Sequence, residues 1–118
     1  MAVKFGNDRN TRAGTTVVRT GIEIAAPEGR AVRAVHDGQV VFANSFTGFG
    51  NLVIVDHGDQ SFSLYGYLSS ISVQRGAAVE RRQLVGTVGR SPLGAQALYF
   101  EIRIDGKPVD PVQWLKTP

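Results

Sequence analysis

Residues 97–103 read Ala-Leu-Tyr-Phe-Glu-Ile-Arg, and this stretch decides the fold of the chain. One set of alternate positions, continued by the next residue, is apolar: Leu98, Phe100, Ile102 and Ile104. The other set includes a phenol, a carboxylate and a guanidinium: Ala97, Tyr99, Glu101 and Arg103. Because successive side chains of a strand point to opposite faces, this alternation predicts a β-strand with one face in a core. The second face is either solvated or a working surface, and the stretch alone favours neither.

The composition is that of an ordinary globular protein. The chain has 118 residues, 42% of them hydrophobic and 19% charged, and carries a net charge of +3. Its basic residues are scattered, so nucleic acid is not an expected partner. The chain has no cysteine, which excludes disulfides and thiolate metal sites, and no apolar run long enough for a transmembrane helix. We expect residues 1–118 to be one domain, with its core at about 5–115, excised from a longer protein.

Short apolar or alternating segments separated by glycine-containing turns fill the rest of the chain. Strands are expected at 16–19, 21–27, 31–35, 39–43, 52–56, 61–68, 71–79, 82–89 and 97–104. Residues 1–15 are expected to be a loop or a short lead-in strand. Residues 110–115 are expected to form one helical turn, with Asp110 as N-cap and Pro111 at the first helical position. Many short strands without long helical periodicity predict an all-β sandwich or barrel-like fold.

The segment 61–68 should pair with 52–56 as an antiparallel hairpin. Its alternation places Phe62, Leu64, Gly66 and Leu68 on one face, and Ser63, Tyr65 and Tyr67 on the other. We interpret Tyr65, Tyr67, Tyr99 and Arg103 as lying on faces that point away from the core.

Four segments in order resemble one family: Gly-Ile-Glu-Ile-Ala-Ala-Pro (21–27), Gly-Phe-Gly-Asn (48–51), Leu-Tyr-Gly-Tyr-Leu (64–68) and Leu-Tyr-Phe-Glu-Ile-Arg (98–103). The family is the LytM domain of lysostaphin-type zinc metallopeptidases, which cut peptidoglycan cross-links. The resemblance covers about residues 5 to 115. It implies a twisted antiparallel sheet, or barrel-sandwich hybrid, with glycine-rich loops and the short C-terminal helical turn.

The zinc-site positions of that family hold other residues here. The family binds zinc through His-x-x-x-Asp and the second histidine of His-x-His, and the resemblance places Arg19, Glu23 and Tyr99 at those positions. The two assisting catalytic histidines become Tyr67 and Ala97. An arginine repels a dication, and a phenol with a pKa of about 10 is a poor zinc ligand and a poor general base. We therefore expect no metal, no cofactor and no peptidase activity.

The two histidines of the chain and the carboxylate of Glu23 are expected to have structural roles. His36 and His57 align with no ligand position, and each is expected to be a turn histidine bonded to the backbone. A buried Glu23 without a cation needs a partner, so we expect it to accept a hydrogen bond from Tyr99 or to pair with Arg19 or Arg103. The alternative is a Glu23 turned to solvent.

Tyr-Gly-Tyr together with Leu-Tyr-Phe-Glu-Ile-Arg resembles most closely the EnvC-type murein hydrolase activators, a degenerate branch of the family. This implies a regulator in the periplasm or envelope of a Gram-negative cell, at the division site, which engages the regulatory helix of a cell-wall amidase. The implied zinc-free groove is lined by Arg19, Thr20, Glu23, Tyr65, Tyr67, Tyr99 and Arg103. Truncating Tyr67, Tyr99 or Arg103 should then weaken binding and leave the fold intact, whereas Phe100→Ala should destabilise it.

Two other functions are compatible with the sequence. A non-catalytic peptidoglycan-binding module would use the same tyrosines to hold glycan or peptide. A biotinyl- or lipoyl-type carrier is suggested by the valine, glutamine and glycine rhythm of residues 73–86. Such a carrier needs an exposed lysine at a hairpin tip, and Lys107, the nearest one to such a turn, lies outside that rhythm. The carrier therefore ranks last.

Overall fold

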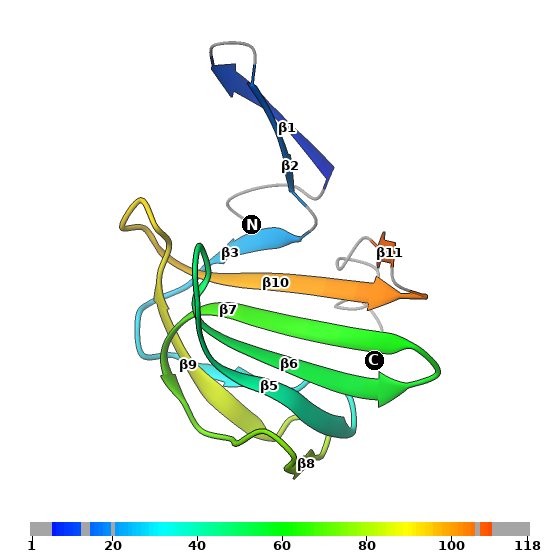
Figure 1. Cartoon of the computed structure of the whole chain (residues 1–118). Helices are drawn as coiled ribbons and strands as arrows, with labels where there is room; N and C mark the ends of the chain where they lie inside the picture. Colours follow the sequence, from blue (N-terminus) through cyan, green and yellow to red (C-terminus); the bar gives the residue numbers. More distant parts are fainter. Residues whose placement is uncertain (1–5, 13–14, 20, 106, 110–118) are drawn as a thin grey trace.

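The computed structural model describes residues 6–12, 15–19, 21–105 and 107–109, with side chains described from residue 21 onward. These residues contain strands and no helix (Figure 1), which confirms the all-β prediction. The strands are β1 (Gly6–Arg12), β2 (Thr15–Arg19), β3 (Ile22–Ala25), β4 (Ala31–Arg33), β5 (Gly38–Phe46), β6 (Gly50–Gly58), β7 (Ser61–Ile71), β8 (Ala78–Val79), β9 (Leu84–Arg90), β10 (Gln96–Ile104) and β11 (Lys107–Val109). The helical turn expected at 110–115 lies outside the described residues.

β1 and β2 form a separate antiparallel sheet of two strands, which stands away from the main body in Figure 1. The sequence predicted at most a short lead-in strand before residue 16, whereas β1 has seven residues. β1 is polar and has no apolar alternation of its own. β1 forms through its pairing with the β-branched β2, because strand formation depends strongly on the neighbouring strand. The residue types of β1 alone therefore do not predict a strand.

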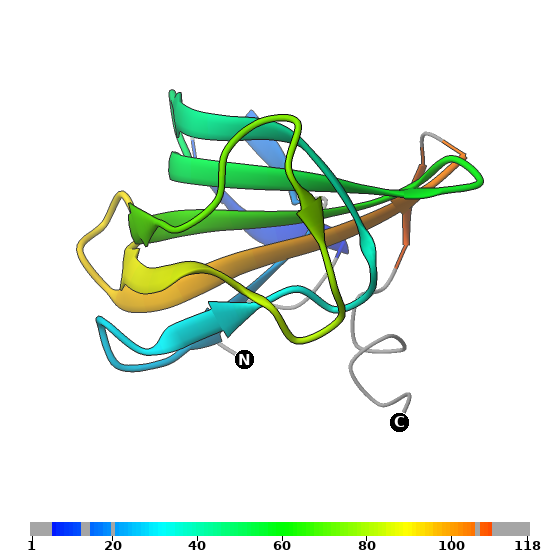
Figure 2. The same ribbon diagram turned by 90° about the horizontal axis from the view of Figure 1, so that it is seen from below.

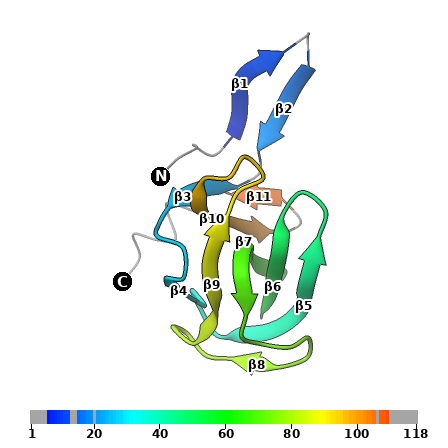
Figure 3. The same ribbon diagram turned by 90° about the vertical axis from the view of Figure 1, so that its left-hand side faces the viewer.

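The main sheet has nine strands, with β11, β10, β9, β7, β6, β5 and β8 in order and with β3 and β4 paired to β10 and β9. Its strand pairs are antiparallel, and the predicted hairpin of β6 and β7 is confirmed. On the side away from β6, β7 changes its partner: residues 61–66 pair with β10, and residues 68–71 pair with β9. This change of partner goes with the strong curl of the sheet, which Figures 2 and 3 show from two further sides.

The main core fills the inside of the curled sheet. Its buried members come from many strands: Ile22, Val32, Ala34, Val40, Val53, Val55, Tyr65, Leu68, Val79, Val85, Val88, Phe100 and Ile102. Phe100 and Ile102 are buried there, and Leu98 and Ile104 pack against them, as the alternation of residues 97–104 predicts. The regular alternation of β10 therefore identifies the core side correctly.

The alternation of β7 does not hold beyond Tyr65. Tyr67 has a φ of 63°, and the register between β6 and β7 shifts at this point. A residue in this left-handed conformation acts as a bulge and re-aims its side chain. Tyr65 and Leu68 consequently belong to the main core, whereas Tyr67 lies in a second cluster. The prediction that Tyr65 lies away from the core and lines a groove is therefore wrong.

A chain of hydrogen bonds runs from the core to the turn before β5. His57 Nδ1 lies 2.7 Å from the carbonyl oxygen of Asp37, which can only accept, so Nδ1 carries a hydrogen. His57 Nε2 then accepts from Ser63 Oγ at 2.7 Å, and Ser63 Oγ accepts from the Tyr65 hydroxyl at 2.6 Å. The Tyr65 oxygen accepts from the Val35 amide at 3.1 Å. The predicted backbone bond of His57 is confirmed, and neutral His57 satisfies every group in this chain.

We expect the protein to lose stability as the pH falls below about 6.5. Burial lowers the pKa of His57 from its ordinary value of 6.5, helped by His36 and opposed by the bond to Asp37 and by the charges of Asp56 and Asp37. If Nε2 of His57 were protonated, it would donate a hydrogen bond to Ser63 Oγ, and the direction of the hydrogen bonds from Ser63 to Tyr65 would have to reverse. A group with a depressed folded-state pKa of this kind stabilises the fold above its unfolded pKa, and this contribution is lost on acidification.

The measurement is the melting temperature at pH 7.5 and at pH 5 for wild type and His57→Gln. The glutamine does not titrate, while His36, Asp37 and Asp56 are present in both proteins. The melting temperature should fall further between pH 7.5 and pH 5 in the wild type than in the variant. An equal loss in both proteins would show that His57 is not the group responsible.

Candidate functional site

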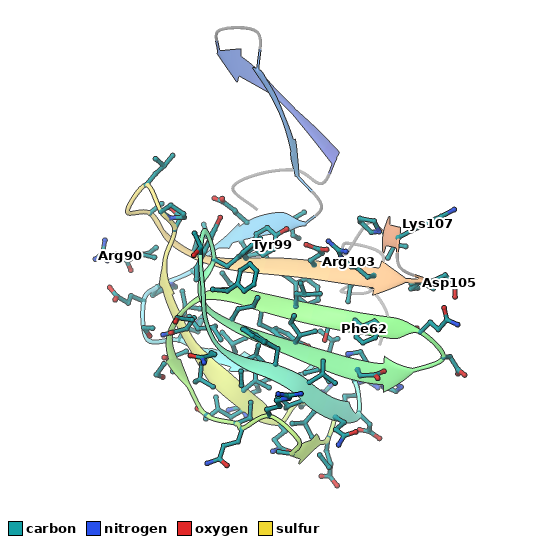
Figure 4. All side chains as sticks on the ribbon, in the orientation of Figure 1. Phe62, Arg90, Tyr99, Arg103, Asp105 and Lys107 are labelled. Atoms are coloured by element: carbon teal, nitrogen blue, oxygen red, sulfur yellow. The ribbon has the colours of Figure 1, made fainter. Side chains whose placement is uncertain are left out.

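The candidate site lies on the sheet face that carries Ala97, Tyr99, Glu101 and Arg103, here called the site face. In the register of the sheet, Glu23 of β3 is the partner of Tyr99, and Tyr99 is also the partner of Gly66 in β7. Cross-strand partners share a face, so these three positions form one row. A Cβ atom added to Gly66 would lie 3.3 Å from the Cβ of Tyr99, so the glycine leaves room for the Tyr99 side chain. Figure 4 shows the labelled Tyr99 on β10.

Tyr67 reaches the same point from the bulge in β7. Its hydroxyl donates a hydrogen bond to Glu23 Oε2 at 2.8 Å, and its ring centroid lies 5.6 Å from that of Tyr99. Tyr67, Tyr99 and the small Ala97 form a second buried cluster, against which Phe49 packs. The exposed fraction is only 5% for Tyr67 and 4% for Tyr99. These tyrosines are therefore buried parts of the site and not the open contact surface that the sequence analysis expected.

A second set of hydrogen bonds runs along β10. The Tyr99 hydroxyl donates to Glu101 Oε1 at 2.7 Å, and Arg103 Nε donates to Glu101 Oε2. Glu101 is 1% exposed, whereas 41% of the Arg103 side chain is exposed. The buried carboxylate of Glu101 therefore accepts hydrogen bonds from the buried hydroxyl of Tyr99 and from the partly exposed guanidinium of Arg103.

These bonds correct the expected partner of Glu23. Among the described residues, Tyr67 donates to Glu23, while Tyr99 and Arg103 both donate to Glu101, so the alternatives in which Tyr99 or Arg103 bonds to Glu23 are wrong. The alternative of a pair between Glu23 and Arg19 involves a side chain outside the described part and stays a prediction. The residue pattern placed Glu101 on the candidate working face, but its bonds to Tyr99 and Arg103 were not predicted. The available signal was its position two residues from both Tyr99 and Arg103, because side chains at this spacing share a strand face.

Four of the positions at which the resemblance placed ligands or catalytic residues lie together: Glu23, Tyr67, Ala97 and Tyr99. The side chains of Arg19 and Thr20 lie outside the described part. Within that part, no group of three or more His, Asp or Glu residues could hold a metal ion. The donor set does not fit zinc, since it offers phenols and a carboxylate where a catalytic site needs imidazoles.

The site face continues as an apolar strip across β7, β6 and β5. Leu64 is the partner of Glu101 and of Ile54, and Ile54 is the partner of Phe42. Phe62 is the partner of Arg103, and the two are labelled on neighbouring strands in Figure 4. All four apolar side chains are half-buried: Phe42, Ile54, Phe62 and Leu64. This strip was not predicted from the sequence, because the alternation of residue types in β7 suggested the reverse assignment of its two faces.

Comparison with known proteins identifies the family. Residues 17–111 match Peptidase family M23. The chain belongs to this family. Murein hydrolase activator EnvC of Escherichia coli is 44% identical over 96 residues, which are 80% of this chain and 23% of EnvC. Murein hydrolase activator NlpD of Escherichia coli is 38% identical over 96 residues, which are 80% of this chain and 25% of NlpD.

A solved M23 structure has the same fold. A single-residue mutant of the catalytic domain of the prophage-encoded M23 protein EnpA from Enterococcus faecalis superposes with a TM-score of 0.77 and 32% identity. The match covers 92% of this chain and 85% of the EnpA chain. The predicted LytM-type family and twisted antiparallel sheet are therefore confirmed.

The matched relatives are longer than this chain, and their names give different roles. The chain spans about a quarter of the length of the curated M23 relatives EnvC and NlpD. EnvC and NlpD are named as activators of murein hydrolases, whereas the EnpA structure is that of a catalytic domain. Helices able to cross a membrane are absent from the described residues.

Proposed function

We propose that this M23 chain is a non-catalytic regulator that binds and activates a cell-wall amidase in the periplasm of a Gram-negative bacterium. The observation that carries the proposal is the bonding at Glu23 and Tyr99, two positions at which the resemblance places the zinc ligands of the family's peptidases: Tyr67 donates to Glu23, and Tyr99 donates to Glu101. The names of EnvC and NlpD support a role in murein hydrolase activation. Because the chain spans a quarter of these relatives, we also propose that it is one domain of a longer protein.

The apolar strip and Arg103 form the surface that we assign to the partner. An amphipathic helix binds by laying its apolar stripe against such a surface. Arg103 uses Nε for Glu101, and its guanidinium has further N–H donors on a side chain that is 41% exposed. Those donors suit an acidic side chain or the last carbonyls of a helix. Tyr67 and Tyr99 support this surface from below, and Tyr65 takes no part in it.

We expect Phe62→Ser and Arg103→Gln each to weaken amidase binding by roughly thirtyfold, because truncating a central anchor costs about 2 kcal/mol. Glutamine at 103 keeps an N–H donor near Glu101, while it removes the charge. Affinity for purified full-length amidases should be measured beside the release of dye from labelled cell walls. Leu84→Ser is the matched control, because Leu84 is an apolar residue, 36% exposed, at the start of β9.

The same assay tests the absence of catalysis. The chain alone, with and without added zinc, should release no dye, and zinc-dependent release would contradict the proposal.

Sedimentation with purified peptidoglycan distinguishes the proposed regulator from the alternative function, a peptidoglycan-binding module. Binding to peptidoglycan without any activation of an amidase would favour the non-catalytic peptidoglycan-binding module instead. Melting temperatures of the variants show whether a loss reflects binding or folding.

A further inference from the structure

Four turns in the described part of the chain share one backbone geometry. Each is closed by a hydrogen bond from the amide of its fourth residue to the carbonyl of its first, and its third residue has a left-handed φ. These turns are residues 27–30, 46–49, 74–77 and 80–83. A left-handed third residue favours glycine, and the first three turns have Gly29, Gly48 and Gly76 there, with φ values of 91°, 88° and 94°. The fourth turn instead has Arg82, with a φ of 71°.

Arg82 therefore occupies a position at which a glycine would be less strained. Its side chain is exposed, and it makes no hydrogen bond or ion pair with any described side chain that would explain its presence in the turn. Strain of this kind is concentrated at functional sites, because other residues would relieve it. The outlier points to a role for the Arg82 guanidinium outside the fold itself.

Two more arginines lie beside Arg82. The Arg82 amide donates to the Ala34 carbonyl at 2.8 Å, and the amide of the neighbouring Arg81 donates to Asp37 Oδ1 at 2.7 Å. Arg33 donates through Nη1 to the Arg82 carbonyl at 3.2 Å. Arginines that are far apart in the sequence are thus brought together by the bonds between two turns.

The turn on the other side of β8 adds Arg75. The amide of Gly76 donates to the Val40 carbonyl at 2.7 Å, which holds this turn beside the start of β5. Residues 74–83 contain three arginines and one glutamate, Glu80, so they carry two of the three net positive charges of the chain. In Figures 1 and 3, β8 lies at the end of the molecule away from the β1–β2 hairpin. We call the following residues the cationic end: Arg33, Arg75, Arg81 and Arg82.

Most guanidinium groups of the cationic end have no carboxylate partner among the described residues. Arg90 and Arg103 each pair with a glutamate. By contrast, Arg75, Arg81 and Arg82 are exposed and make no ion pair with any residue that the structure describes. Unpaired guanidinium groups present N–H donors in a fork that matches the oxygens of a phosphate.

An exposed leucine lies among these arginines. Leu84 is 36% exposed, follows Arg82 by two residues and is the cross-strand partner of Arg33. Basic side chains around an apolar one are typical of surfaces that bind an anionic bilayer, because the charges meet lipid phosphates while the apolar side chain enters the acyl boundary. Nucleic acid would supply the phosphates but no apolar region for the leucine.

We propose that the cationic end binds the surface of an anionic phospholipid bilayer. The inference goes beyond the proposed function and does not depend on it, because the cationic end shares no residue with the site face. It explains why an arginine occupies a turn position that suits glycine, and why three guanidinium groups lack a partner in the described chain.

The experiment measures cosedimentation of the chain with phosphatidylcholine vesicles that contain or lack phosphatidylglycerol. The wild type should bind the phosphatidylglycerol vesicles more tightly, and high salt should remove the difference. Arg81→Gln and Arg82→Gly should each weaken this binding about fivefold, and the double variant about twenty-five-fold, since each arginine near an anionic surface contributes that much. Lys107→Gln is the matched control, because it removes the same charge from exposed Lys107 of β11, at the opposite end of the strand order from β8. It should bind within about twofold of wild type.

The melting temperature of Arg82→Gly separates binding from folding. Glycine relieves the left-handed φ, so this variant should melt at or above the wild-type temperature while it binds vesicles more weakly. A lower melting temperature together with wild-type vesicle binding would show that Arg82 serves only the fold, and would overturn the inference.

Other outcomes would also overturn it. They are equal binding of the wild type to both kinds of vesicle, and equal binding of the wild type and the double variant. Loss of binding to duplex DNA or to purified peptidoglycan in the double variant, with unchanged vesicle binding, would assign the cationic end to that polymer instead. Amidase affinity should stay at the wild-type value in the double variant, so the proposed function is tested separately.

Discussion

Phe100→Ala is expected to lower the free energy of unfolding by about 3–5 kcal/mol. Phe100 is 1% exposed in the main core, its ring centroid lies 5.6 Å from that of Tyr65, and its cross-strand partner is Ile22. The alanine would leave a cavity at the point where β3, β7 and β10 meet. Urea unfolding followed by circular dichroism measures the loss.

Phe100→Leu is the matched control. It keeps most of the apolar volume and should cost less than about 1.5 kcal/mol. If Phe100→Ala costs no more than Phe100→Leu, the core around this ring is not packed as described. Both variants leave Tyr99 and Glu101 on the opposite face unchanged.

Tyr99→Ala is expected to cost almost as much, about 3–4 kcal/mol, although Tyr99 lies on the other face of β10. Its ring is 4% exposed and packs with Tyr67 and Phe49, and its hydroxyl donates to the buried Glu101. Because both rings are buried, we now expect that truncating Tyr99 or Tyr67 destabilises the fold, and not that it leaves the fold intact. The measurement is again urea unfolding.

Tyr99→Phe isolates the hydroxyl. It keeps the ring and removes one hydrogen bond to a buried carboxylate, which should cost about 1–3 kcal/mol. A Tyr99→Ala protein that unfolds at the wild-type urea concentration would show that this second cluster contributes nothing to stability. Because both substitutions alter the support of the apolar strip, their effect on amidase binding should be interpreted beside their stability.

The sequence predicted those parts of the fold whose side-chain period is regular. Phe100 and Ile102 were assigned to the core because β10 alternates without interruption. Tyr65 was assigned to the wrong face because the left-handed φ of Tyr67 turns Tyr67 to the site face beside Gly66, so Tyr65 and Tyr67 do not share a face. A non-glycine residue in that conformation leaves no signal in the residue types, so the bulge was not predictable from the pattern.

The candidate site was also predicted only in part from the sequence. The motifs brought Glu23, Tyr67, Ala97 and Tyr99 to one place, but they did not say which hydroxyl serves which carboxylate. Tyr99 has one carboxylate across the strand pair and another two residues along its own strand, and only the orientation of the ring decides between them.

The pairing of β3 with β10 has a consequence for the order of folding. Glu23 and Tyr99 are cross-strand partners, yet they come from opposite ends of the chain. The hairpins β5–β6 and β6–β7 close short loops and can form early, whereas the β3–β10 pair must close a long one. We therefore expect the candidate site to assemble late, after β10 docks beside β7. A chain that is free to fold only as far as β9 could form these hairpins but would lack Tyr99, Glu101 and Arg103 of β10, so it could not yet engage a partner.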